Sequence, residues 1–442
     1  MKNLGILWAQ YGPYHFARAA ALKKRSGLVK VFALELANQT SDYEWKRSAA
    51  VDLITFCPDE VTEHLSFWKV FKRARRIFSE LKIDVCILPS YAPKQSLAAF
   101  LAAKSLGVRT VMMNESHAGT ARASGAAAWV KRRLVQAFDS ALVGGRPQKR
   151  YFAALGLPAE KIFTGYDAVD NDYFAGKAEA VRSRADDFRE KYDLPGHYFL
   201  SLGRFVAKKN LPVLIRAYRK LLDSNRECQT HLVMVGSGEE DAKLKALCEE
   251  LRLPVYQKLT AGVQNKDSNV NQDLPGVHFY GFRQIEENPV FYALAEAFIL
   301  PSLWEEWGLV VNEAMACGLP VIVSDTVGCA EDLLNQGTPV SFDTSKFEPL
   351  LKRLDGLRQN GFVFDPHSED ALAEALGALI SVPGLRESMS AKSRAIVENF
   401  SCDHFAWNAL RAASVALGEN PANLPDATTA EELAGLDSKL FS

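Results

Sequence analysis

The sequence predicts an α/β protein built from two doubly wound, Rossmann-like domains that face an interdomain cleft. Short apolar runs alternate with amphipathic helical segments, which is typical of a parallel sheet covered on both faces. The alternation stops at a charged stretch, 181–197, and then starts again. The length of 442 residues suits two such domains. We expect an N-terminal domain over 1–185, a C-terminal domain over 196–403, and a final helix with a polar tail over 404–442 that could cross back to the first domain.

The individual elements follow from hydrophobic pattern and from the residues that end helices. In the first half the expected strands are 4–9, 29–34, 84–90, 109–114 and 140–145, with helices at 16–25 and 94–107. In the second half the expected strands are 198–204, 230–238, 277–282, 296–302 and 319–325, with helices at 211–225, 240–251 and 404–417. Two polar segments, 256–275 and 336–359, are expected to be surface insertions.

Composition indicates a globular protein, with 48% hydrophobic and 24% charged residues. The first apolar run is too short for a signal peptide, and no window approaches the 18 apolar residues of a membrane span. The seven cysteines are scattered without a C-x-x-C pair, which favours a reducing, cytoplasmic setting. Residues 1–180 hold 26 Lys+Arg against 16 Asp+Glu, whereas 181–442 hold 26 against 37. The basic first half is expected to meet something anionic.

Polar residues follow the expected strands, which is where doubly wound sheets bind ligands. The segment SLGRFVAKKN places Gly203, Arg204 and Lys209 just after the strand 198–204. Gly203 allows the backbone to approach a ligand closely, and the two cations could clamp a diphosphate. A solvated basic loop before a helix would show the same residues.

The stretch PSLWEEWGLVVNEAMACGLPVIVSD, 301–325, carries three glutamates after another strand. Its helix is expected to start near 309 and to end before Gly318 and Pro320. The N–H groups of Gly308, Leu309 and Val310 would then form an anion site at the helix start.

The three glutamates differ in their expected roles. Glu313 lies one helical turn further in, within reach of a ribose, although it could also be a surface helix residue. Glu305 would face the other side of the phosphates. Glu306 is most simply a solvated loop carboxylate.

Several segments, in this order and spacing, resemble the retaining glycosyltransferases of the GT-B fold, family 4 type. The resemblance covers nearly all of the second half and, more weakly, the first. It rests on LGRFVAKKN (202–210), LVMVGSG (232–238), VHFYGF (277–282), the stretch 301–325, NGFVFDPHSEDALAEAL (360–376) and AEKIFTGYDAVDNDYF (159–174).

The resemblance implies that a hexose is transferred from a nucleotide-diphosphate sugar to a hydroxyl of a glycan or glycolipid. A UDP-sugar is expected as the donor in preference to a GDP-sugar. Its paired glutamates, seven residues apart, correspond to Glu305, which would contact the transferred sugar, and Glu313, which would hold the ribose. Arg204 and Lys209 would neutralise the diphosphate, so that neither a metal nor a protein nucleophile is needed. The implied donor site also includes Gly12, Gly203, Phe282, Gly308, Leu309 and Val310.

The chain departs from the family pattern at three places. The loop after the first strand has one glycine, Gly12, where two adjacent ones are usual. After the strand 109–114 the chain offers Glu115 and His117, and we expect His117 to lie near the reacting sugar unless it is a solvated loop residue. Cys329 replaces a glycine and is expected to be a small buried residue.

The acceptor side is expected in the basic N-terminal domain. The segments 66–78 and 129–138 interleave cations with aromatic residues, as helices at anionic membrane surfaces do, and an ordinary amphipathic helix would also fit. We therefore expect a sugar, lipid-linked or small-molecule acceptor, possible peripheral contact with the inner face of a membrane, and no nucleic-acid partner.

Three other functions remain open from the sequence. A nucleotide-sugar epimerase would share the architecture but needs acid and base groups at the sugar carbon. A nicotinamide-dependent oxidoreductase would explain VGSGEE (235–240), yet no complete G-x-G-x-x-G follows a first strand. A non-catalytic nucleotide-sugar-binding protein would keep the same donor residues.

Overall fold

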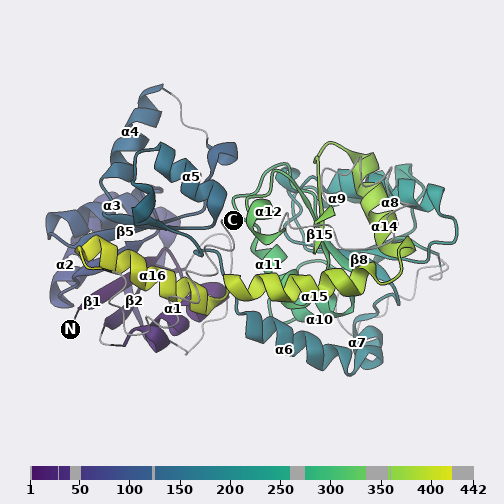
Figure 1. Ribbon diagram of the computed structural model, residues 1–442, viewed down its shortest axis with the longest axis horizontal. Helices are drawn as coiled ribbons and strands as arrows, with labels where there is room; N and C mark the ends of the chain where they lie inside the picture. The colour runs from purple at the N-terminus through teal and green to yellow at the C-terminus, as the bar shows by residue number, and fades with distance from the viewer. Residues whose placement is uncertain are drawn as a thin grey trace. The chain divides into compact units, whose positions relative to one another are not determined.

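The computed structural model describes residues 2–27, 29–39, 51–121, 125–258, 274–334, 357–358 and 360–420 (Figure 1). The chain forms two compact units, one of Met1–Val169 with Ser401–Ser442 and the other of Asp170–Phe400. Most of the two expected insertions, 256–275 and 336–359, and the polar tail beyond 420 lie outside the described residues.

Unit 1 contains a parallel sheet in the order β3-β2-β1-β4-β5-β6-β7. Its strands are β1 (Asn3–Trp8), β2 (Lys30–Gln39), β3 (Leu53–Val61), β4 (Val85–Leu88), β5 (Arg109–Asn114), β6 (Ser140–Val143) and β7 (Ile162–Phe163). Its helices are α1 (Pro13–Arg25), α2 (Phe67–Glu80), α3 (Lys94–Ser105), α4 (Gly125–Gln136), α5 (Arg146–Ala154) and α16 (Cys402–Leu417). The short 3-10 turns are η1 (Thr62–His64), η2 (Ala118–Thr120) and η3 (Ala159–Lys161).

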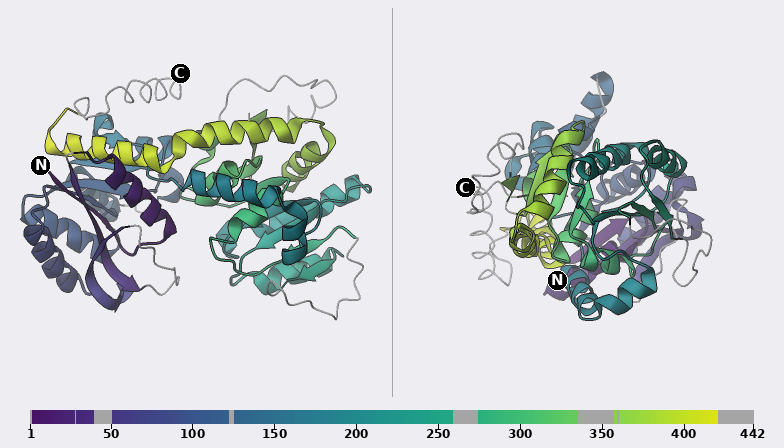
Figure 2. Two further views of the ribbon diagram at one scale, coloured as in Figure 1. Left: turned by 90° about the horizontal axis from the view of Figure 1, so that it is seen from below. Right: turned by 90° about the vertical axis from the view of Figure 1, so that its right-hand side faces the viewer.

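The sheet of unit 1 is covered on both faces, and successive side chains of each strand point to opposite faces. Ile6 and Trp8 of β1 pack in one apolar cluster with Phe16 of α1 and Phe405 of α16. Leu7 of β1 packs in the other cluster, with α2 and α3. The final helix α16 therefore belongs to unit 1, where it lies against α1, as the views in Figure 2 show. The Ser140 hydroxyl donates to the Ala412 carbonyl at 2.7 Å and ties α16 to β6.

Unit 2 contains a second sheet in the order β10-β11-β9-β8-β12-β13-β15-β14, parallel except for β14. Its strands are β8 (Tyr198–Leu202), β9 (His231–Val235), β10 (Val255–Gln257), β11 (Val277–Phe279), β12 (Ala297–Leu300), β13 (Val321–Ser324), β14 (Leu357–Arg358) and β15 (Gly361–Phe364). Its helices are α6 (Asn171–Arg182), α7 (Ala185–Tyr192), α8 (Leu211–Ser224), α9 (Asp241–Glu250), α10 (Asn288–Leu294), α11 (Leu309–Ala316), α12 (Ala330–Leu333), α14 (Glu369–Ser381) and α15 (Leu385–Val397). The 3-10 turns are η4 (Ala207–Lys209) and η6 (Glu398–Phe400).

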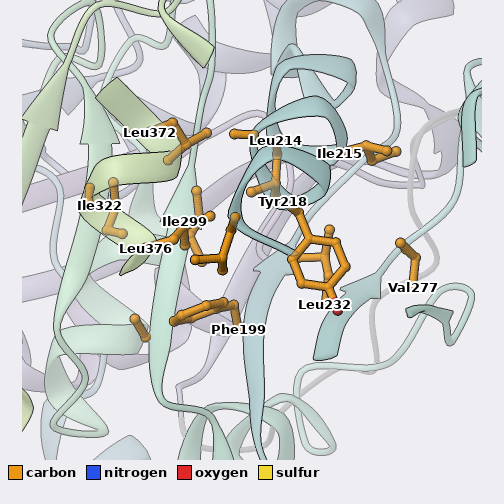
Figure 3. Packing of buried hydrophobic residues seen from close by; sticks show 14 of the residues in the cluster. Phe199, Leu214, Ile215, Tyr218, Leu232, Val277, Ile299, Ile322, Leu372 and Leu376 are labelled. Carbon is orange, nitrogen blue, oxygen red and sulfur yellow. The ribbon is translucent and has the colours of Figure 1, made fainter. Parts of the chain in front are cut away.

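The core of unit 2 lies between its sheet and the helices α8 and α14. Figure 3 shows Phe199 and Ile299 of neighbouring strands facing Leu214 of α8 and Leu376 of α14. These side chains are at most 1% exposed, so the sheet is a rigid support for the loops that follow its strands. The two Rossmann-like sheets confirm the predicted fold class.

Some details differ from the sequence expectations. Residues 170–185, which we placed in the first domain, pack with unit 2, because α6 contacts α10 and α11 there. The charged stretch 181–197 contains the helix α7, and residues 255–257 at the start of an expected insertion form the edge strand β10. Among the described residues, no helix is long and apolar enough to cross a membrane.

Candidate active site

Two loops of unit 2 meet because the strands before them are neighbours in the sheet. β8 pairs with β12, so their carboxyl ends lie at the same edge. The loop after β8 contains the turn η4, and the loop after β12 leads into α11. The Leu303 amide donates to the Lys208 carbonyl at 2.8 Å and joins the two loops directly.

The Gly-x-Gly pair after β9 serves this loop contact. A Cβ on Gly236 would lie 1.8 Å from the Gly203 carbonyl oxygen, and one on Gly238 would lie 2.3 Å from that of Phe205. The Phe205 amide donates to Ser237 at 2.9 Å. Both glycines are therefore needed for the close approach of the loop that carries Arg204.

Glu305 sits between two lysines. Lys208 Nζ lies 2.9 Å from Glu305 Oε1, and Lys209 Nζ contacts Glu305 Oε2. Glu305 is only 9% exposed. Burial by itself would raise the pKa of this carboxyl, but Lys209 and then Lys208 outweigh burial and hold the pKa below its usual value. Glu305 is thus ionised at neutral pH, and the expected pair Lys209 and Glu305 is in direct contact.

We expected Glu306 to be a solvated loop carboxylate, but it forms an ion pair. Its Oε2 atom lies 3.2 Å from Lys208 Nζ, which therefore bridges two carboxylates. Burial lowers the pKa of Lys208, but Glu305 and Glu306 more than compensate, so the pKa is raised. Lys208 was not among the predicted residues, because no local pattern distinguishes it from its neighbour Lys209.

The start of α11 is fixed by the two residues before it. Gly308 has φ of 105°, a conformation that favours glycine, and a Cβ there would lie 3.1 Å from Leu300. The buried Trp307 donates through Nε1 to Asn312 at 2.9 Å. Leu309 and Val310 are half-buried in the first turn, where backbone N–H groups lack intrahelical acceptors. This arrangement suits an anion.

Glu313 follows in the next turn of α11 and is completely buried. It is not the surface helix residue that the sequence left open. Its role as the ribose ligand stays a prediction.

Two other predicted donor residues are accessible. Arg204 is exposed in the loop after β8. Phe282 follows β11 and is 49% exposed, which is unusual for a phenylalanine and leaves its ring available for stacking. β11 and β8 flank β9 in the sheet, so all these loops leave the same edge. Cys329 is buried, as expected.

The predicted residues of the first domain lie in unit 1. Gly12 precedes α1, and its amide donates to His15 Nδ1 at 3.0 Å. His117 follows β5 and caps the start of the turn η2, where its Nδ1 accepts from the Gly119 amide at 3.2 Å. Since Nδ1 accepts, Nε2 is the ring atom that carries hydrogen in neutral His117.

Unit 1 also contains a buried charged group that the sequence did not reveal. Arg18 and Asp167 are at most 1% exposed, and their side chains approach to 4.0 Å. Burial, followed by the hydrogen-bonded Glu115 carboxylate, raises the pKa of Asp167 well above its usual value, and Arg18 opposes this only in part. Glu115 is thus engaged with Asp167, and no pattern in the sequence links these positions, which come from three separate elements.

The sequence D-N-D at 170–172 resembles a metal-binding motif, but Asp170 caps α6 by accepting from the Tyr173 amide at 3.0 Å. Within the ranges that the structure describes, no group of three His, Cys, Asp or Glu side chains is arranged to hold a metal ion.

Comparison with known proteins identifies a family model that matches unit 2. Residues 196–381 match the family model described as "Glycosyl transferases group 1". The matched range contains the loops after β8, β11 and β12, and hence every candidate residue of unit 2.

Among curated relatives, an uncharacterized glycosyltransferase of Methanocaldococcus jannaschii is 26% identical over 219 residues, which is 49% of this chain and 45% of that protein. A "GDP-mannose-dependent alpha-(1-6)-phosphatidylinositol monomannoside mannosyltransferase" of Mycolicibacterium smegmatis is 25% identical over 346 residues, covering 76% of this chain and 77% of that protein. The match thus spans less than half of the first relative.

Among solved structures, a glycosyltransferase from Rickettsia africae aligns with a TM-score of 0.67 and 16% identity over 94% of this chain and 98% of that one. At this identity the likeness shows the fold alone. The fold that the two chains share is the GT-B fold.

Proposed function

We propose that the protein is a retaining glycosyltransferase that moves a hexose from a nucleotide-diphosphate sugar to a hydroxyl acceptor without a metal ion. The observation that carries the proposal is the contact between Lys209 and Glu305 at the ends of neighbouring strands, beside the start of α11. A cation for the diphosphate and a carboxylate for the sugar are thereby held next to a helix N-terminus.

The donor diphosphate is proposed to lie against Arg204, Lys209 and the first-turn amides of α11. Breaking the sugar–phosphate bond leaves negative charge on the departing phosphate oxygen. Cations and amide groups that are already aimed at this oxygen stabilise the transition state without reorganising. Phe282, exposed after β11, is proposed to stack on the nucleobase.

Glu305 is proposed to accept hydrogen bonds from hydroxyls of the transferred sugar. Its lowered pKa keeps it ionised and therefore an acceptor only. The acceptor hydroxyl attacks on the face from which the phosphate departs, and the departing phosphate takes its proton. His117 of unit 1, with hydrogen on Nε2, is proposed to donate to the transferred sugar.

A donor screen tests the proposal. UDP-glucose, GDP-mannose and ADP-glucose are added separately, and the melting temperature of the full chain is measured; GDP-mannose is included because one relative is named for it. We expect one of the three nucleotide sugars to raise the melting temperature, and UDP-glucose is the first candidate. If none of the three sugars raises the melting temperature, the proposal is contradicted. If the protein forms a new epimer of the sugar without any acceptor, it is an epimerase instead.

We also propose that unit 1 binds an acceptor at an anionic membrane surface, on the cytoplasmic side. One face of α2 carries Trp68, which is 67% exposed, followed by the exposed cations Lys72, Arg75 and Arg76. Positions four, seven and eight residues apart share a helix face. The helix α4 stands out from unit 1 in Figure 1 and exposes 61% of Trp129. Exposed tryptophan beside cations fits anionic headgroups.

Flotation with vesicles tests this partner. The wild type is expected to float with vesicles containing phosphatidylglycerol at low salt but not with phosphatidylcholine alone. A variant with Lys72, Arg75 and Arg76 changed to Gln is expected to lose most of the flotation. Absence of wild-type flotation at low salt contradicts the membrane partner and leaves the donor site unaffected.

A further inference from the structure

Four charged side chains form one continuous chain across the two loops of the donor site. Lys209 contacts Glu305, Glu305 contacts Lys208 at 2.9 Å, and Lys208 contacts Glu306 at 3.2 Å. The charges of these four groups balance. Glu306 lies outside the glutamate pattern of the family that the sequence resembles, so the resemblance assigns no role to the last link.

We infer that Lys208 is a positioning residue for Glu305, and that Glu306 in turn holds Lys208. This inference rests on the proposed function, in which Lys209 binds the donor diphosphate. Lys208 keeps the Glu305 carboxylate in place and ionised when Lys209 is drawn to the phosphate.

The need for a second lysine follows from burial. Glu305 is 9% exposed, so water cannot replace a cation that is lost from its side. A diphosphate that arrives at Lys209 competes for this lysine and also repels the nearby carboxylate. Both effects favour protonation of Glu305, which would then lose its capacity as a pure acceptor. Lys208 opposes both effects.

Lys208 is better suited to this role than to phosphate binding. Its ammonium lies between two carboxylates, whereas Lys209 contacts Glu305 only among the ion pairs that the structure describes. The Lys208 side chain is 29% exposed and that of Glu305 12%, so water only partly screens this ion pair. Its backbone carbonyl accepts from Leu303, so the loop contact does not depend on the Lys208 side chain. Glu306 gives the Lys208 ammonium group a second ion pair and so helps to hold it in place.

The test uses the sugar from the donor screen of UDP-glucose, GDP-mannose and ADP-glucose that binds the wild type most tightly. Its Kd is measured by calorimetry between pH 5 and pH 8 for the wild type and for Lys208→Met, Lys208→Arg and Glu306→Gln. Lys220→Met is the matched control, because Lys220 also bridges two carboxylates in unit 2, Glu369 at 3.1 Å and Asp370 at 2.8 Å.

We expect Lys208→Met to bind the donor at least about tenfold more weakly at pH 7, since one partner of a largely buried carboxylate is lost. The acid limb of binding should also move to higher pH, because the pKa of Glu305 rises when a cation is removed. Lys208→Arg should restore both properties, Glu306→Gln should lose a smaller part in the same direction, and Lys220→Met should match the wild type.

Three results would overturn the inference. Lys208→Met could bind as tightly as the wild type; it could bind weakly with an unchanged pH profile; or Lys208→Arg could fail to rescue it. Each would show that the charge of Lys208 does not act through Glu305. If the wild type itself binds none of the three sugars, the proposed function fails first, and the inference fails with it.

Discussion

Gly236→Ala should damage the donor site from a position that no ligand is expected to touch. Gly236 has φ of 144°, and an added Cβ would lie 1.8 Å from the Gly203 carbonyl oxygen and 2.9 Å from its carbon. Neither atom belongs to a flexible side chain, so the loop of Gly203 and Arg204 must move.

The size of the effect has two contributions. Forcing extra volume into a packed region costs about 1–3 kcal/mol, and a non-glycine residue in this backbone region costs about 1–3 kcal/mol more. We therefore expect about 4 kcal/mol of lost stability in unit 2. For a domain of this size each kcal/mol lowers the melting temperature by about 2–4 °C, so the fall should be about 10 °C.

Gly377→Ala is the matched control. Gly377 lies within α14, and its added Cβ would meet only Leu221 at 3.6 Å, an ordinary contact. This variant should be more stable by up to about 1 kcal/mol, because alanine favours the helix.

The assay combines thermal unfolding followed by circular dichroism with calorimetric donor binding at a temperature where both variants are folded. Gly236→Ala should melt lower and bind the donor more weakly, whereas Gly377→Ala should do neither. If Gly236→Ala melts within about 1 °C of the wild type and binds equally well, the loop contact does not position Arg204 and the reasoning is wrong.

Three further predictions address the site and its support. Arg204→Ala should lower kcat much more than it raises the donor Kd, because the charge acts mainly on the departing phosphate; unchanged turnover in a steady-state assay would refute the clamp. Trp307→Phe should lose about 1–3 kcal/mol in denaturant unfolding, since it removes the donor to buried Asn312, and an unchanged midpoint would contradict this. Burial and His231 lower the pKa of His278 to about 2. Below about pH 6.5 the unfolded chain therefore binds a proton that the folded chain does not, and the protein becomes less stable as the pH decreases. His278→Gln should therefore lose less melting temperature than the wild type between pH 7 and pH 5, and an equal loss would exclude this histidine as the cause.

The sequence predicts the buried strands well because both faces of each sheet are covered. The segments 198–204 and 296–302 are mostly apolar and contain Gly203 and Pro301 just after the strand residues, and the structure has β8 and β12 there. The helix of the 301–325 stretch starts at residue 309, as Gly308 indicates. Short or polar elements such as β10 and α7 escape this reasoning, because their stability comes from tertiary contacts rather than from their own pattern.

Residue pairs in the site were only partly predictable. The meeting of Lys209 and Glu305 depends on the order of strands in the sheet, which no local pattern encodes. The bridge from Lys208 to Glu306 depends on the turn η4, where Asn210 adopts a left-handed conformation at φ of 52°. The helix α11, which carries the buried Glu313, packs against α6 and α15, and both come from distant parts of the sequence.

The most direct test of the donor site is a crystal structure of the full chain with UDP bound, or with GDP if the donor screen selects a GDP-sugar. We expect phosphate oxygens within hydrogen-bond distance of the Leu309 and Val310 amides and of Lys209 Nζ, with Glu305 still in contact with Lys208. A nucleotide whose phosphates lie away from both the start of α11 and Lys209 would contradict this expectation.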